Sequence, residues 1–388
     1  MKSSHATWIF SLILMAAAQP LFAEPFYTGQ LIAPLNDLHN HGSSVIELPN
    51  GDVLVSWYKG SGERSADDVK IVGARMRQGM EEWSEVFDMA DFEDFPDCNV
   101  CMTLDREGKL WIFWPLVLAK RWETSILMSR YSTDYLGPDC PKWDWQKPII
   151  LKPGEKFAED SLKAIESFEK ELPEAGVGRL AEVIESLKEK VKDPYARQTG
   201  WMPRANPTVL PNGRILLPLY SDGFSFSLVA YSDDNGATWQ ASRPILSMGG
   251  VQPSIVWKED GTLAAFMRDN GPPPKRVIYS ESTDGGETWS RGVDLELPDT
   301  GAGVQALRLK NGHWLLLNND VEEGRHSLGL HLSDDEGKTW KWTRHLELVE
   351  PGEGSFSYPS MYQSQFGDIH CTYSYKKKAD GEGETIKY

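Results

Sequence analysis

The sequence predicts an all-β protein, a six-bladed β-propeller with an α-helical insertion between blades 2 and 3. Two repeats support this prediction: an eight-residue motif that recurs three times, and a glycine turn that recurs six times ahead of strand-like runs. The composition agrees, because 15 Trp and 34 Gly among 388 residues suit a β-rich protein with many tight turns.

The N-terminal segment predicts export. Lys2 supplies a positive start, and an apolar run over 8–18 follows it. Ala23 then offers a small residue for cleavage, which completes the layout of a signal peptide whose apolar run is too short to cross a bilayer. We therefore expect residues 1–23 to be removed. The mature domain, 24–388, would be secreted or periplasmic, without an integral membrane segment.

The charge of the chain restricts its partners. The formal net charge is −17, which argues against nucleic acid, because phosphate binding needs a basic face. An acidic ligand remains compatible with this charge only if a few Arg or Lys side chains converge in a locally positive pocket. We expect a monomer.

The four cysteines do not indicate a metal or redox site. They are Cys98, Cys101, Cys140 and Cys371, which allow three disulfide pairings if the protein is exported. The first two have the spacing of half a zinc site, but no second such pair and no His pair accompanies them. A local bridge or buried thiols are the favoured interpretation, and we expect no metal and no cofactor.

The eight-residue motif reads S-x-D-x-G-x-T-W. It occurs at Ser232–Trp239, Ser282–Trp289 and Ser333–Trp340, so that its starts lie 50 and 51 positions apart. The Asp carboxylate can accept hydrogen bonds from turn amides, and the Gly permits positive φ. The Trp can bury its indole between neighbouring sheets. The motif therefore predicts a structural hairpin and not an active site.

The turn glycines give the number of blades. They are Gly51, Gly108, Gly213, Gly261, Gly312 and Gly367, each followed by a strand-like run. Such turns between β-rich runs indicate hairpins. Four of the five intervals between these glycines are similar in length, and the remaining one, between Gly108 and Gly213, is about twice as long.

A helical hairpin accounts for the long interval. Residues 155–192 are rich in Glu, Lys, Leu and Ala, with apolar residues at helical spacing, and Pro173 divides them. We place the insertion at 153–195, where it either flanks the pocket or decorates the surface. A propeller closes by pairing its termini in one blade, and residues 26–32 are the expected outer strand of blade six.

The repeated motif is the Asp box, and on it the chain resembles the sialidase-like, BNR-repeat propellers over about residues 26–388, apart from the insertion. Segments such as His41–Leu48 and Met267–Gly271 resemble a divergent bacterial branch of that family. The resemblance implies an exo-α-sialidase-like site: three arginines on the sugar carboxylate, a Tyr nucleophile polarised by Glu, and an Asp acid/base. A Tyr nucleophile avoids the repulsion that a carboxylate would meet from the sugar's own carboxylate.

The resemblance assigns roles to individual residues. Arg268 and Arg325 resemble the second and third arginines, and Asp269 follows the first of these as a further substrate-binding candidate. Tyr358 stands where the nucleophile would lie, and Asp67 stands in the blade-one loop where the acid/base is expected. Guanidinium groups suit a carboxylate because they bind it with two parallel hydrogen bonds. The alternatives are surface salt bridges for the arginines and core packing for the tyrosine.

Two departures from the family pattern concern the same site. The first arginine is absent near the opening strand of blade one, where His39 and His41 stand instead. The expected glutamate is Gln252, which cannot act as a general base. Histidine titrates near neutrality, so His41 is a candidate substitute base, although both histidines are equally compatible with structural roles.

Three functions remain open from the sequence. The leading one is a secreted sialidase-like glycoside hydrolase acting on an acidic, carboxylated glycan or oligosaccharide. A propeller-type polysaccharide lyase on uronates would keep the arginines and use His41 or Tyr358 to remove the C5 proton. A non-catalytic carbohydrate-binding propeller is the third, because one fold hosts many functions.

Overall fold

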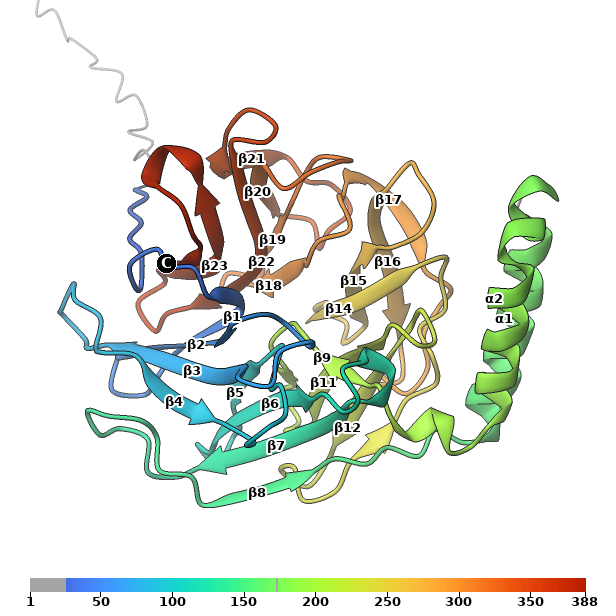
Figure 1. Ribbon diagram of the computed structural model, residues 1–388, viewed down its shortest axis with the longest axis horizontal. Helices are drawn as coiled ribbons and strands as arrows, with labels where there is room; N and C mark the ends of the chain where they lie inside the picture. The colour runs from blue at the N-terminus through green and yellow to red at the C-terminus, as the bar shows by residue number, and fades with distance from the viewer. Residues whose placement is uncertain (1–25, 172–173) are drawn as a thin grey trace, which may run out of the picture.

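A computed structural model describes residues 26–171 and 174–388, which form six antiparallel sheets arranged around a central axis (Figure 1). The predicted signal peptide lies outside the described residues. None of the described helices combines the length and the apolar character needed to cross a membrane.

Blades 1 and 2 precede the helical insertion, and blade 3 follows it. Blade 1 comprises β1 (His39–Glu47), β2 (Val53–Gly60), β3 (Lys70–Met76) and β4 (Phe87–Ala90). Blade 2 comprises β5 (Cys101–Leu104), β6 (Leu110–Leu116), β7 (Ile126–Ser132) and β8 (Trp145–Pro148). Blade 3 comprises β9 (Met202–Pro203), β10 (Thr208–Val209), β11 (Ile215–Ser221), β12 (Phe226–Ser232) and β13 (Gln240–Ala241).

The remaining three blades complete the ring. Blade 4 comprises β14 (Gly250–Trp257), β15 (Leu263–Asp269), β16 (Arg276–Ser282) and β17 (Val293–Pro298). Blade 5 comprises β18 (Gln305–Arg308), β19 (Trp314–Asn318), β20 (Ser327–Ser333) and β21 (Trp342–Leu348). Blade 6 comprises β22 (Gly354–Gln363), β23 (Ile369–Lys377) and β24 (Thr385–Lys387). Short 3-10 turns occur at Trp122–Thr124, Ala196–Gln198 and Lys378–Asp380.

The two ends of the described chain close the ring, as predicted. The backbone amide of Gln30 donates to Tyr388 O at 2.8 Å, and the amide of Ile32 donates to Ile386 O at 3.0 Å. Residues 30–32 therefore run beside β24 as the outer edge of blade 6, and Figure 1 shows the C-terminus next to the first described residues. Closure by hydrogen bonds between the ends of the chain removes the free edges that an open ring would leave.

The Asp boxes form the predicted hairpins and also connect blades. In the first box, Asp234 Oδ1 accepts hydrogen bonds from Ser232 Oγ and from the amide of Thr238, both at 2.8 Å. The indole of Trp239 donates to Gly236 O at 3.1 Å, and its ring packs against Phe113 of blade 2 with centroids 5.5 Å apart. The box therefore satisfies its own turn while its Trp contacts the preceding blade.

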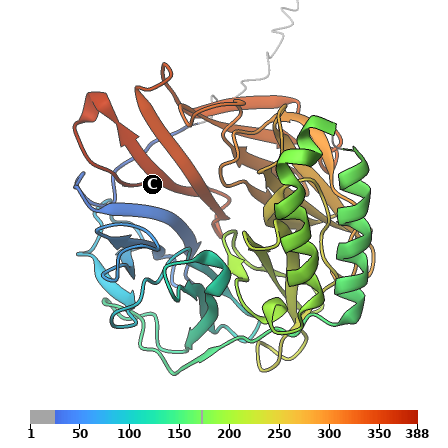
Figure 2. The ribbon, with the colours of Figure 1, turned by 45° about the vertical axis from the view of Figure 1, so that its right-hand side comes forward.

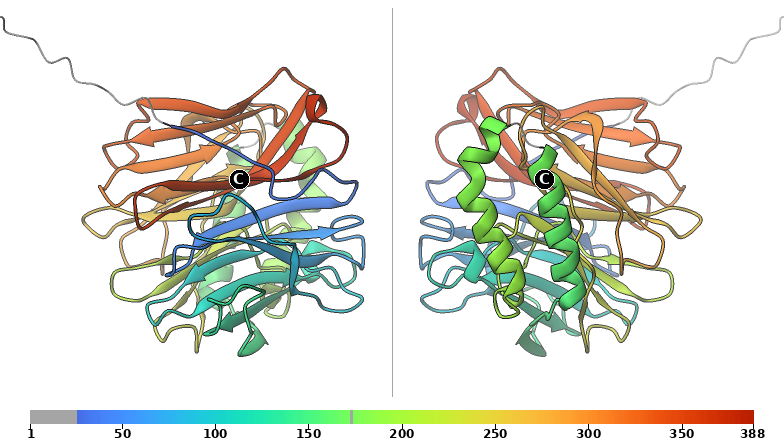
Figure 3. Two further views of the ribbon diagram at one scale, coloured as in Figure 1. Left: turned by 90° about the vertical axis from the view of Figure 1, so that its left-hand side faces the viewer. Right: turned by 90° about the vertical axis from the view of Figure 1, so that its right-hand side faces the viewer.

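The insertion forms two helices, α1 (Glu155–Glu171) and α2 (Glu174–Lys192). They stand against the outer side of the propeller, away from its axis (Figures 1, 2 and 3). Buried Phe157 packs against Trp201 with ring centroids 5.8 Å apart, and Arg291 of blade 4 holds Glu171 through two hydrogen bonds. The hairpin thus covers the outer side of blades 3 and 4, in agreement with the interpretation as a surface decoration.

Candidate active site

The innermost strands of three blades break their register at equivalent places. The breaks lie between His41 and Ser44 in β1, between Val251 and Ser254 in β14, and between Ser357 and Ser360 in β22. A left-handed residue occupies each break: Gly42 with φ 63°, Gln252 with φ 57° and Tyr358 with φ 55°. A non-glycine residue in this region is strained, and such strain concentrates at functional sites. The bulges redirect the side chains around them.

Serines that follow the bulges connect the blades around the axis. Ser360 Oγ accepts a hydrogen bond from the amide of Val45 at 3.1 Å, which joins blade 6 to blade 1. Ser44 Oγ accepts from the amide of Met102 at 3.0 Å, which joins blade 1 to blade 2. The bulged residues are therefore held by a ring of inter-blade bonds.

Tyr358 lies among three arginines. Its hydroxyl is 2.6 Å from Arg268 Nη1, which donates a hydrogen bond to it. The guanidinium carbons of Arg204, Arg268 and Arg325 lie 5.0, 5.9 and 5.4 Å from the centre of the Tyr358 ring. Gly303 makes room for this arrangement, because a Cβ there would lie 3.3 Å from Tyr358 Cα.

Among the described residues, these three guanidinium groups form no salt bridge with an acidic side chain. Salt bridges hold surface arginines such as Arg214 and Arg291. Within the part of the chain that the structure describes, however, the bonds of the three central arginines go to backbone carbonyls and hydroxyl groups. Nε of Arg204 and Nε of Arg268 are buried without a hydrogen-bond partner. Buried cations are ordinarily paired, so this cluster is suited to receiving an anion.

The arginine charges act on the phenol and on the neighbouring imidazole. Burial alone would raise the pKa of Tyr358, but the charges of Arg268 and Arg325, together with hydrogen bonding by Gln252, lower that pKa below its ordinary value. The ring of His41 lies 4.3 Å from the ring of Tyr358, centroid to centroid. Burial, the charge of His39 and the arginine charges lower the pKa of His41 well below its ordinary value, so His41 is neutral at physiological pH.

Two carboxyl groups act electrostatically on this cluster. Glu63, in the loop between β2 and β3, accepts a hydrogen bond from Tyr58 Oη at 2.8 Å, and its negative charge acts on Tyr358. Asp222 follows β11 and interacts electrostatically with Arg268. The Asp222 side chain remains open to solvent, yet the protein around its carboxyl group raises the pKa of that group above the usual range.

Most of the residues that the sequence singled out meet at this point. The structure brings together Arg268, Arg325, Tyr358, Gln252 and His41. His39 lies at the margin, where its Nδ1 is 2.5 Å from Glu384 Oε1 and its ring is 5.1 Å from that of His41. The roles of these residues in binding and catalysis stay predictions.

Two of the predicted residues lie elsewhere. Asp67 is half exposed on the blade-one loop, where Lys120 Nζ donates to it at 3.1 Å. Its neighbour Asp68 accepts hydrogen bonds from the amide and hydroxyl of Ser61, so it fixes the loop. Asp269 is buried and accepts from the amides of Gly271 and Arg276, which is a turn-stabilising arrangement.

Sequence reasoning missed Arg204 and Glu63. The family pattern places the first arginine in blade 1, whereas the remaining arginine beside Tyr358 comes from blade 3, where Arg204 donates to Ser43 O at 3.2 Å and to Pro359 O at 3.1 Å. The sequence contains one signal that could have identified Arg204. A polar residue, Asn206, follows it by two positions, just as Ser360 follows Tyr358. Burial lowers the pKa of Arg204 to about 10, which leaves it charged at neutral pH.

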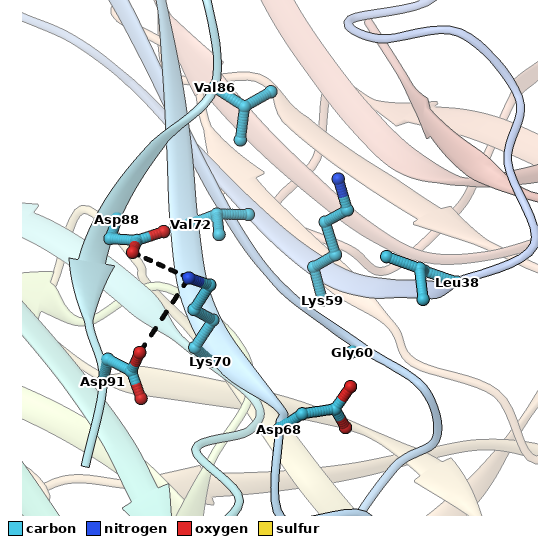
Figure 4. A pocket seen from close by; sticks show the side chains of 9 residues that line it. All are labelled: Leu38, Lys59, Gly60, Asp68, Lys70, Val72, Val86, Asp88 and Asp91. Carbon is cyan, nitrogen blue, oxygen red and sulfur yellow. Dashed lines mark hydrogen bonds and ion pairs between the residues drawn. The ribbon is translucent and has the colours of Figure 1, made fainter. Parts of the chain in front are cut away.

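A separate hollow of about 520 Å³ lies beside blade 1 (Figure 4). Lys59, Lys70 and Asp88 are among its lining residues, and Lys70 Nζ pairs with Asp88 at 2.7 Å. None of the three central arginines and no part of Tyr358 lines this hollow, so it is distinct from the candidate active site.

Comparisons with known proteins agree with the fold and the repeat. A BNR repeat-like domain matches residues 195–371. The chain is 27% identical over 181 residues to an anhydrosialidase of Macrobdella decora, covering 42% of this chain and 23% of that protein. It is 28% identical over 137 residues to a sialidase of Micromonospora viridifaciens, covering 33% of this chain and 20% of that protein. The matches thus span less than a quarter of these two relatives.

Solved structures match nearly the whole chain at low identity. A protein of unknown function from Dyadobacter fermentans has a TM-score of 0.66 and 16% identity, with 92% of this chain and 96% of that chain covered. The NanB sialidase of Streptococcus pneumoniae has a TM-score of 0.65 and 13% identity, with 92% of this chain and 69% of that chain covered. At these identities the likeness concerns the fold.

Proposed function

We propose that this chain, a six-bladed propeller of the sialidase-like, BNR-repeat class, is a glycoside hydrolase that acts on an acidic, carboxylated glycan. The observation that carries the proposal is the set of three guanidinium groups around Tyr358, held without an acidic partner among the described residues. In a chain of net charge −17, such a locally positive centre favours an anionic ligand. The predicted export and monomeric state belong to the same proposal.

In the proposed reaction the arginines bind the sugar carboxylate and Tyr358 attacks the anomeric carbon. A phenol oxygen meets less repulsion from that carboxylate than a carboxylate nucleophile would. Glu63 then protonates the leaving oxygen and later activates water, as a retaining mechanism requires. We assign this role to Glu63 because its charge acts on Tyr358, whereas Asp67 pairs with Lys120 in solvent.

The uronate lyase is the second candidate, and one observation favours it. The imidazole of His41 packs against Tyr358 with ring centroids 4.3 Å apart, which places a second side chain capable of proton transfer beside the phenol. A lyase would leave the arginines in the same role, since neutralising the carboxylate acidifies the neighbouring C–H bond.

Product analysis separates these functions. The purified protein is incubated with 3′-sialyllactose and with oligogalacturonates in ¹⁸O-labelled water, and products are analysed by mass spectrometry and near-ultraviolet absorbance. The hydrolase predicts products that gain one labelled oxygen, and loss of turnover in Tyr358→Phe with ligand binding retained. An unsaturated product without labelled oxygen would favour the lyase, and saturable binding without any product would favour the binding propeller.

A further inference from the structure

The phenol of Tyr358 lacks the acidic partner that the family pattern supplies. Gln252 stands beside the phenol at the position where the family pattern has glutamate. Its side chain is 1% exposed, and its Oε1 has no hydrogen-bond partner. An amide has no basic oxygen or nitrogen at physiological pH, so Gln252 cannot remove a proton from the phenol. The phenol oxygen accepts a hydrogen bond from the Arg268 guanidinium at 2.6 Å, and hydrogen bonding by Gln252 also favours its ionised form.

We propose that Tyr358 stands as a phenolate paired with Arg268, so that the site needs no general base to activate its nucleophile. The ionised state is a property of the resting protein, and only its use in catalysis rests on the proposed function. A hydrogen bond between a guanidinium and an oxyanion is about twice as strong as a neutral one, and a separation of 2.6 Å suits it.

The charges that face Tyr358 favour its ionisation. The positive groups are Arg204, from the segment after β9; Arg268, on β15; and Arg325, from the segment before β20. The acidic groups are Glu63, which accepts a hydrogen bond from Tyr58 and acts on Tyr358, and Asp222, which acts on Arg268. Even with both carboxyl groups ionised, the three guanidinium charges leave a positive surplus that a phenolate neutralises.

Three further titratable groups around Tyr358 are neutral. Burial raises the pKa of Tyr58, on β2, and of Tyr220, on β11, well above the ordinary value, and it lowers the pKa of His41, on β1. His41 also meets Tyr358 by ring contact, with centroids 4.3 Å apart, and among the described residues its imidazole makes no hydrogen bond to the phenol oxygen. An imidazole base is therefore not needed to explain activation.

In the proposed reaction every proton and bond is accounted for without a general base that deprotonates the nucleophile. The phenol loses its proton to water before substrate binds. The phenolate oxygen then forms a bond to the anomeric carbon while the glycosidic C–O bond breaks, and the leaving oxygen takes the proton of Glu63, whose carboxyl group is protonated in the complex that reacts. Water next attacks the same carbon, Glu63 takes a proton from it, and the bond to Tyr358 breaks so that the electron pair returns to the phenolate beside Arg268.

The resting ionisation state is measured without substrate. The absorbance of phenolate is titrated in the intact protein and in Tyr358→Phe, and the difference isolates this tyrosine. We expect the difference to show a step below the ordinary tyrosine pKa of about 10. A parallel difference for Tyr195→Phe, which removes an exposed tyrosine, serves as the control for how the titration reports a single tyrosine.

Two variants test the cause. Gln252→Glu adds a negative charge beside the phenol, and Arg268→Gln removes the positive one; each should raise the Tyr358 step by about one unit or more. Either variant suffices if the other fails to fold. A wild-type step at or above about 10, or a step that neither variant moves, would overturn the proposal.

A kinetic measurement tests the catalytic use of the phenolate separately from the absorbance titration. If the protein hydrolyses an acidic glycan, Gln252→Glu should move the acid limb of kcat/KM to higher pH, because the phenol must then ionise against an added charge. Absence of hydrolysis would contradict the proposed function but would leave the phenolate measurement standing. Hydrolysis without the spectroscopic step would contradict the phenolate alone.

Discussion

Replacing Arg325 by alanine should separate ligand binding from stability. The Arg325 guanidinium makes one long side-chain hydrogen bond, 3.3 Å to Ser357 Oγ, and it sits 5.4 Å from the ring of Tyr358. Its removal should therefore change the free energy of unfolding by no more than about 1 kcal/mol. A hydrogen bond to a charged ligand contributes about 1.5–3 kcal/mol, so the affinity for a carboxylated sugar should fall roughly 10- to 150-fold.

The assay is calorimetric titration with N-acetylneuraminic acid, with thermal unfolding measured on the same samples. Arg344→Ala is the matched control, because Arg344 is exposed on the same blade and its loss changes the net charge equally. We expect the control to bind as the wild type does. An affinity loss below threefold for Arg325→Ala, or an equal loss in the control, would refute the reasoning.

Three further predictions concern the acid, the repeat and the insertion. Glu63→Gln should lower kcat by about 100-fold or more in steady-state assays, whereas Asp67→Asn should stay near wild type; the reverse would restore the acid/base role first predicted for Asp67. Asp284→Ala, which removes an acceptor for the amides of Glu287 and Thr288, should lower the free energy of unfolding by about 1–3 kcal/mol, and no change would contradict the structural role of the Asp box. Phe157→Ala should cost about 3–5 kcal/mol in denaturant titrations, and a loss below about 1 kcal/mol would mean that the insertion packs loosely.

The blades could be predicted from the sequence because their determinants are local. Within Ser232–Trp239, the Asp carboxylate, the Ser hydroxyl and the turn amides bond to one another inside eight residues, so the spacing alone indicates the hairpin. The closing strand was also predictable, since a ring must pair its ends. The helical hairpin followed from its apolar spacing, although its place on the outer side did not.

The site could be predicted only in part because its partners meet through ring closure. Arg204 reaches the carbonyl of Pro359, which lies 155 positions away, and no local pattern connects the two. The choice of carboxylate on the blade-one loop depends on which side chains are already engaged. Asp68 binds the amide of Ser61 and Asp67 binds Lys120, whereas Glu63 accepts from Tyr58 and acts electrostatically on Tyr358.

A crystal structure of Tyr358→Phe soaked with 3′-sialyllactose tests the central claim most directly. We predict a sugar ring over Phe at this position, with its carboxylate within hydrogen-bonding distance of Arg268 and Arg325 and its glycosidic oxygen toward Glu63. The account would be contradicted if the sugar bound on another surface. It would also be contradicted if the arginine cluster kept its positions but held no sugar at a saturating concentration.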